Sequence, residues 1–199
     1  MKKVLIAFAV IVLVAISVPV IGGIMSSVNP SKSIEMAQNK KVSSSPISTY
    51  YNPARGIKFA FPDGWTQDDR LIDGPKPLIG RFYKETASVQ LGHFSKADSE
   101  YMNFTDLKKG MLKQLAFTPG FTLISESDTT VNDLMVYKLV TTIEDQNKNT
   151  IKNMIYLYFP TDGDMFVSLT YTNQPENFDT FAKEFEAIAS SMAVLTPSK

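Results

Sequence analysis

The chain has 199 residues, with 20 basic and 20 acidic residues, one histidine and no cysteine. The lack of cysteine excludes a disulfide scaffold, an iron–sulfur centre, a zinc site with cysteine ligands and a cysteine nucleophile. The single histidine, His93, also excludes metal sites that need several histidines. The length and the 44% content of hydrophobic residues are typical of one globular domain with short additions.

The N-terminal segment is long, apolar and uncharged. After Lys2 and Lys3, no charged residue occurs in residues 4–25. A helix of that length is about 33 Å long, enough to cross a hydrocarbon core of about 30 Å. We therefore expect residues 1–25 to anchor the protein in the cell membrane as a single pass, with the N-terminus cytoplasmic and the rest outside. The alternative is a signal peptide, cleaved after a small residue such as Ser17, and a secreted protein.

Residues 26–49 have the composition of a flexible linker. They contain eight serines together with Pro30 and Pro46, and they show no long apolar period. A globular domain is expected over residues 50–195. From residue 50 onward there are 15 basic and 19 acidic residues, a formal net charge of 15 − 19 = −4. Because nucleic-acid binding requires a basic surface, we expect no nucleic-acid partner.

The periodicity of the domain predicts seven strands and two helices. The first helix, residues 105–115, has Leu107, Met111 and Leu115 along one face. The second begins at Pro175 and presents three phenylalanines and several smaller apolar residues on one face. The order βββ-α-ββββ-α predicts an α+β fold with a central, mainly antiparallel sheet. The predicted strands are residues 56–61, 78–84, 88–94, 121–127, 134–144, 150–159 and 165–172.

The start of the domain carries a resemblance to a known superfamily. Residues 56–65, Gly-Ile-Lys-Phe-Ala-Phe-Pro-Asp-Gly-Trp, resemble the opening strand and turn of PsbP-like domains. That superfamily includes the Ran-binding Mog proteins and the bacterial DcrB-like domains. The long run of strands over residues 134–172 and the closing helix with Phe178, Phe181 and Phe185 are also similar.

The resemblance implies an α/β/α sandwich over residues 50–195, and an accessory or adaptor module rather than an enzyme. Photosynthetic members are extrinsic subunits of photosystem II, so such a role is expected only in a photosynthetic host. Cyanobacterial members resemble lipoproteins, whereas this chain lacks the cysteine that a lipid anchor requires.

Residue patterns that carry chemistry are few. No Ser lies in a G-x-S-x-G string and no phosphate-binding glycine loop occurs, so we predict no catalytic residue and no cofactor. A structural or surface position is favoured for His93 over a role as base or ligand, and a core position is favoured for Trp65. Asn103 is favoured as a helix cap over a glycosylation site. The candidate metal ligands are the closely spaced carboxylates Asp63, Asp68, Asp69 and Asp73, for which turn formation is the competing interpretation.

These observations predict a membrane-tethered, extracytoplasmic, non-enzymatic adaptor that binds another protein of the envelope or of a membrane complex. The alternative is an extracytoplasmic module that binds a small ligand or a divalent cation, in a cleft between sheet and helix or at residues 63–73. A third hypothesis is a hydrolytic enzyme with a pair of carboxylates that no sequence spacing reveals.

Overall fold

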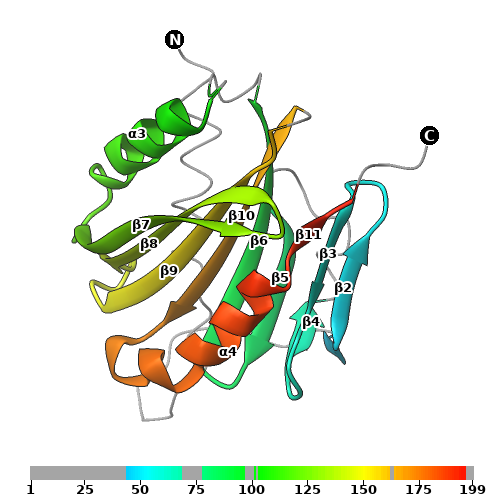
Figure 1. Ribbon diagram of the computed structural model, residues 1–199. Helices are drawn as coiled ribbons and strands as arrows, with labels where there is room; N and C mark the ends of the chain where they lie inside the picture. Colours follow the sequence, from blue (N-terminus) through cyan, green and yellow to red (C-terminus); the bar gives the residue numbers. More distant parts are fainter. Residues whose placement is uncertain (1–43, 69–77, 97–100, 102, 162–163, 196–199) are drawn as a thin grey trace, which may run out of the picture.

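The computed structural model describes residues 44–68, 78–96, 101, 103–161 and 164–195. Within these ranges the chain is an α+β protein with two antiparallel sheets and two helices longer than one turn (Figure 1). The larger sheet has eight strands in the order β1-β4-β5-β6-β10-β9-β8-β7. Its strands are β1 Ser44–Pro46, β4 Thr66–Asp68, β5 Leu78–Lys84, β6 Ala87–Ser95, β7 Thr122–Val131, β8 Leu134–Glu144, β9 Thr150–Phe159 and β10 Met165–Asn173.

Helix α4, Phe178–Ser190, covers one face of this sheet and follows a single 3-10 turn at Pro175–Asn177. Its phenylalanines enter the larger hydrophobic core, where Phe185 contacts the rings of Tyr156 and Tyr171. Burial of each such side chain contributes about 1.5–3 kcal/mol. The predicted apolar face of the closing helix is therefore the face that contacts the sheet.

Helix α3, Phe104–Leu115, lies against the opposite face of the sheet. Leu107, Met111 and Leu115 pack against side chains of β8, β9 and β10. Asn103 is the N-cap, because its side-chain oxygen accepts a hydrogen bond of 2.9 Å from the backbone N–H of Asp106. The interpretation of Asn103 as a cap is thus confirmed.

A second sheet has three strands in the order β11-β3-β2, formed by β2 Thr49–Asn52, β3 Ile57–Ala60 and β11 Ala193–Val194. Its inner side chains join the core that α4 covers. Gly56 has a positive φ of 62°, and its carbonyl accepts a 2.6 Å bond from the backbone N–H of Leu195. The second sheet therefore pairs residues near the start of the domain with residues near its end.

All seven predicted strands and both predicted helices are present along the chain, but the full element order differs from the prediction. Strands β1, β2, β4 and β11 were not predicted. Strands β1 and β4 extend the larger sheet, and β2 and β11 pair with the predicted β3 to form the second sheet. These strands are only 2–4 residues long, too short to show a period. Strand β1 lies within the stretch whose composition indicates a linker. The predicted membrane span, residues 4–25, lies outside the described ranges, and no described helix is long and apolar enough to cross a bilayer.

Candidate protein-interaction edge

Strand β7 forms one edge of the eight-stranded sheet and is exposed along almost its whole length. Residues 122–130 are all exposed, and only Val131 at its end is buried. On its inner side β7 pairs with β8, and no other described strand pairs with it. Its outer backbone groups therefore face solvent in the described part of the chain.

The other described edge strands are much shorter. Strand β1 has three residues, β2 four and β11 two, whereas β7 has ten. Natural sheets avoid edge-to-edge association by short edges, bulges and charged side chains, because unpaired N–H and C=O groups can template another strand. The length of β7 makes it the edge of this fold best suited to accept a further strand.

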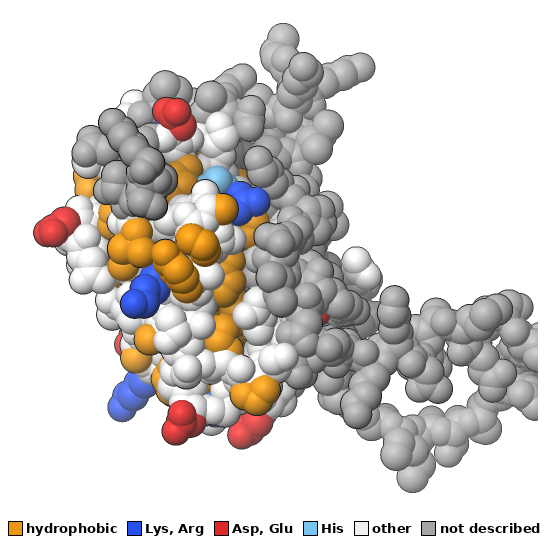
Figure 2. Space-filling model, turned by 90° about the vertical axis from the view of Figure 1, so that its right-hand side faces the viewer, with side chains coloured by type: hydrophobic (Ala, Val, Ile, Leu, Met, Phe, Trp, Pro, Cys, Tyr) orange, Lys and Arg blue, Asp and Glu red, His pale blue; other side chains and the backbone are white. Residues whose placement is uncertain are grey.

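Three large apolar side chains are exposed at or shortly before the start of β7. Phe117 is 80% exposed, Ile124 52% and Leu123 36%. We name these three residues the β7 patch. The other large hydrophobic side chains exposed in the described ranges are Tyr51, on β2 of the second sheet, and Leu195, directly after β11. Figure 2 shows the side of the molecule that carries the second sheet, where hydrophobic side chains are also exposed.

The turn between α3 and β7 places the β7 patch at the surface. Backbone bonds from Thr118 N–H to Leu115 O, 2.8 Å, and from Phe121 N–H to Thr118 O, 3.1 Å, reverse the chain. Phe121 packs against the core beneath α3, while Phe117 points outward. A register shift between Leu123 and Ser125 makes Ile124 an inserted residue of the strand.

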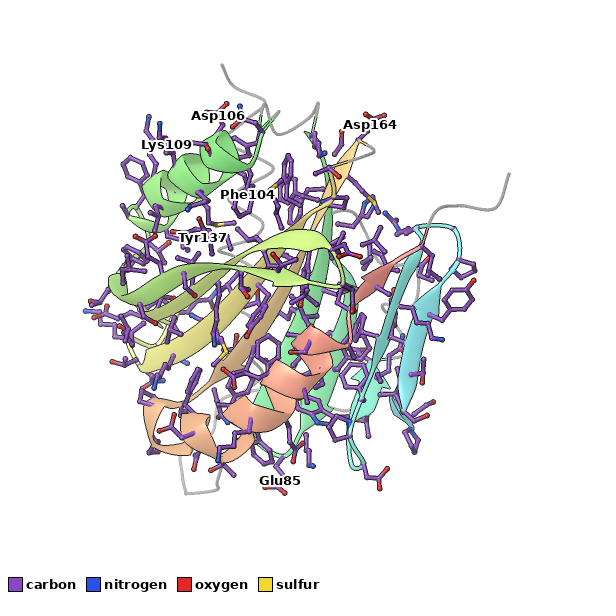
Figure 3. All side chains as sticks on the ribbon, in the orientation of Figure 1. Glu85, Phe104, Asp106, Lys109, Tyr137 and Asp164 are labelled. Atoms are coloured by element: carbon purple, nitrogen blue, oxygen red, sulfur yellow. The ribbon has the colours of Figure 1, made fainter. Side chains whose placement is uncertain are left out.

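Two carboxylates of β7 are bonded to side chains on the face of the sheet that carries α3. The Tyr137 hydroxyl donates to Glu126, and Lys108 Nζ donates to both Asp128 oxygens at 2.6 and 2.7 Å. Lys108 also lies 4.9 Å from the centroid of the Tyr137 ring. Figure 3 shows Tyr137 and Phe104 on the side of the sheet that carries α3. Burial, followed by the bond to Glu126, raises the pKa of Tyr137, so its hydroxyl stays protonated and continues to donate.

His93 has a structural role. It is half-buried on β6, with Nδ1 2.9 Å from Arg55 Nη1 and Nε2 2.8 Å from Met165 Sδ. Since a guanidinium only donates, Nδ1 accepts from Arg55, and the Nε2–H then faces the sulfur. Both ring nitrogens are engaged in a link between β6, β10 and the turn before β3. The structural interpretation of His93 is confirmed.

Only two of the four acidic candidates for a metal site lie in the described ranges. Asp63 is exposed and Asp68 is fully buried, while Asp69 and Asp73 lie outside the described residues. The described chain contains no group of three or more His, Asp or Glu side chains placed to hold a metal ion. Trp65 is 1% exposed, so its predicted core position is confirmed.

The exposed edge was not found from the sequence. The predicted strand ended at residue 127, whereas β7 continues to Val131. The missed signal is the polar run Ser-Glu-Ser-Asp-Thr-Thr at residues 125–130, which has no apolar face. A strand with polar side chains on both faces packs neither face onto a core, as expected of an exposed edge.

The fold is shared with several solved structures, although comparison of the sequence with protein-family models and with characterised proteins gives no match. The solution structure of cyanobacterial PsbP from Synechocystis has a TM-score of 0.55 at 15% identity, covering 79% of this chain and 95% of that one. The Ran-binding protein Mog1p of Saccharomyces cerevisiae has a TM-score of 0.51 at 11% identity, covering 76% and 96%. LpqN of Mycobacterium tuberculosis, involved in cell envelope biogenesis, has a TM-score of 0.50 at 14% identity, covering 84% and 100%. The resemblance to the PsbP and Mog superfamily is thus confirmed at the level of the fold.

Proposed function

We propose that this protein is a membrane-tethered, extracytoplasmic, non-enzymatic accessory domain that binds another protein through β7 and the β7 patch. The observation that carries the proposal is the long exposed edge with three exposed apolar side chains at one end. Large exposed apolar side chains gathered at one place mark interaction surfaces, and aromatic residues are enriched in them.

Two further observations support the proposal. The solved structures that share the fold include a Ran-binding protein and a protein involved in cell envelope biogenesis. The membrane tether rests on the uncharged apolar run at residues 4–25. Deletion of that run should move the protein from the membrane fraction to the soluble fraction of the cell.

Site-specific photo-crosslinking in cells tests the interaction surface. A photoreactive phenylalanine analogue replaces Phe117 in the full chain, and the matched control places it at Tyr51, which is exposed on the second sheet. We expect a discrete crosslink to another protein from position 117 and not from position 51. The crosslink should be lost when Ile124→Asp is added, because a charge then enters the β7 patch. Equal crosslinking from both positions, or none from position 117, would refute the proposed surface.

A further inference from the structure

The outer edge of β7 offers a regular stretch for strand pairing. From Ser125 to Val131 the strand pairs with β8 without interruption, and the bulge at Leu123–Ser125 precedes this stretch. Seven residues at about 3.4 Å each give an edge of about 24 Å. An extended segment of similar length could form a ladder of backbone hydrogen bonds along it.

The side chains of this stretch differ between the two faces of the sheet. Glu126 and Asp128 point to the α3 side, because they pair with Leu139 and Tyr137 of β8, which pack beneath α3. Ser125, Ser127 and Thr129 point to the α4 side. The α3 side of the edge thus has two carboxylates at alternate positions, whereas the α4 side has three hydroxyls and, at its end, Val131.

This pattern disfavours a second copy of the chain as the added strand. Antiparallel pairing of two β7 strands about a two-fold axis at residue 127 places Glu126 opposite Asp128 twice. An axis at residue 126 or 128 places Glu126 or Asp128 opposite its own copy. Like charges directly opposite each other destabilise a strand pair. In each of these central registers of a homodimer, a carboxylate therefore lies opposite another carboxylate.

The same carboxylates are complementary to a basic strand. Lys108 neutralises one of the two negative charges on the α3 side, so these three side chains keep a formal charge of −1 − 1 + 1 = −1. A strand with basic side chains two residues apart would place one opposite each carboxylate. The end of that strand near residue 124 would meet the β7 patch, where an apolar side chain is favoured.

We infer that the partner contributes an extended segment that pairs antiparallel with Ser125–Val131 as a ninth strand of the sheet. The segment has basic residues at alternate positions opposite Glu126 and Asp128, and apolar residues toward the β7 patch. This inference rests on the proposed function and specifies the chemistry of its partner.

The test uses the full chain, purified in a mild detergent, and the fluorescein-labelled peptide Thr-Val-Lys-Thr-Lys-Val-Leu-Leu. Two further peptides have the same sequence with methylated backbone nitrogens. One is methylated at the odd-numbered residues and the other at the even-numbered residues. Because antiparallel pairing uses alternate N–H groups, one methylated peptide should keep its affinity in fluorescence anisotropy and the other should lose at least about tenfold. Equal loss for both, or no binding of the parent peptide up to about 1 mM, would overturn the inference.

A pair of variants tests the charges. Glu126→Gln and Ser127→Lys each raise the local charge by one, but on opposite faces of β7. We expect Glu126→Gln to lower the affinity for the parent peptide several-fold. Ser127→Lys should lower that affinity less. An equal or larger effect of Ser127→Lys would contradict the assigned face. Crosslinking from position 117 could succeed while the methylated peptides and the charge variants both give the contradicting result. In that case the inferred pairing with an added strand is wrong, and the proposed accessory function is still supported.

Discussion

Replacement of Glu184 by glutamine tests how α4 is held to the rest of the domain. Glu184 Oε2 accepts a 2.9 Å hydrogen bond from Trp65 Nε1, and both of its carboxylate oxygens lie 2.9 Å from Lys84 Nζ. Lys84 Nζ also donates to the carbonyl of Asp63 at 2.9 Å. The carboxylate therefore joins the last helix to β5 and to the turn after β3.

The expected loss follows from these contacts. Hydrogen bonds to a charged group contribute about 1.5–3 kcal/mol when protected, and solvent reduces this for an ion pair whose side chains are 19% and 32% exposed. We expect Glu184→Gln to lower the free energy of unfolding by about 1–2 kcal/mol at pH 7. Burial opposes ionisation of Glu184, but the bonds from Lys84 and Trp65 outweigh it and lower the pKa below 4.5.

The sign of the pH dependence follows from that lowered pKa. The contribution of Glu184 is fully present above the unfolded pKa near 4.5 and is lost as the pH falls through the lower folded pKa. Urea titrations of the full chain in detergent, followed by the fluorescence of the single tryptophan, measure it at pH 7 and at about pH 3. The difference between wild type and variant should shrink at the lower pH. A difference that stays constant, or one matched by the exposed control Glu176→Gln, would refute the reasoning.

Three further predictions concern stability. Gly56→Ala should lower the midpoint of thermal unfolding by several degrees. Gly56 has φ +62°, and an added Cβ would clash with the carbonyl oxygen of Leu195. An unchanged midpoint would contradict this prediction. Tyr158→Phe should cost about 1–2 kcal/mol in urea titrations, since the buried hydroxyl donates to Ala189 O at 2.8 Å. Burial raises the pKa of Tyr171 to about 12 from 10.0, so the stability it contributes is complete below pH 10.0 and declines toward pH 12. Thermal melts of Tyr171→Phe should therefore show a smaller loss of stability over this alkaline range than those of the wild type. An equally large loss in the variant would exclude Tyr171 as its source.

The long strands and both helices could be predicted from local periodicity. Strands β5, β8 and β9 begin and end at the predicted residues. Strand β8 alternates over 11 residues, whereas β5 and β9 are largely buried runs of 7 and 10 residues. In β10, alternation separates the two faces correctly, yet both faces are buried. Periodicity reports which side chains share a face. Exposure depends on the position of the strand in the sheet, and β10 lies between β6 and β9.

The candidate site could be predicted only in part. That β7 is an edge follows from pairings among distant strands, which no local pattern contains. The exposure of Phe117 depends on a turn that buries Phe121 and leaves Phe117 outside, although both are phenylalanines beside the same loop. A structural role was expected for His93, but its two partners, Arg55 and Met165, lie far away in the sequence and could not be predicted.

The pairing of β3 with β11 has a consequence for the order of folding. Ile57 pairs with Val194, and Lys58 with Ala193. The pairing of β3, one of the first strands of the domain, therefore depends on one of the last strands. Asn132, in the turn between β7 and β8, likewise donates to the carbonyl of Met192 at 2.7 Å. During synthesis from the N-terminus, neither contact can form until residues 192–194 have left the ribosome. A ribosome-bound chain shorter than this should remain protease-sensitive, and the domain should close late and cooperatively.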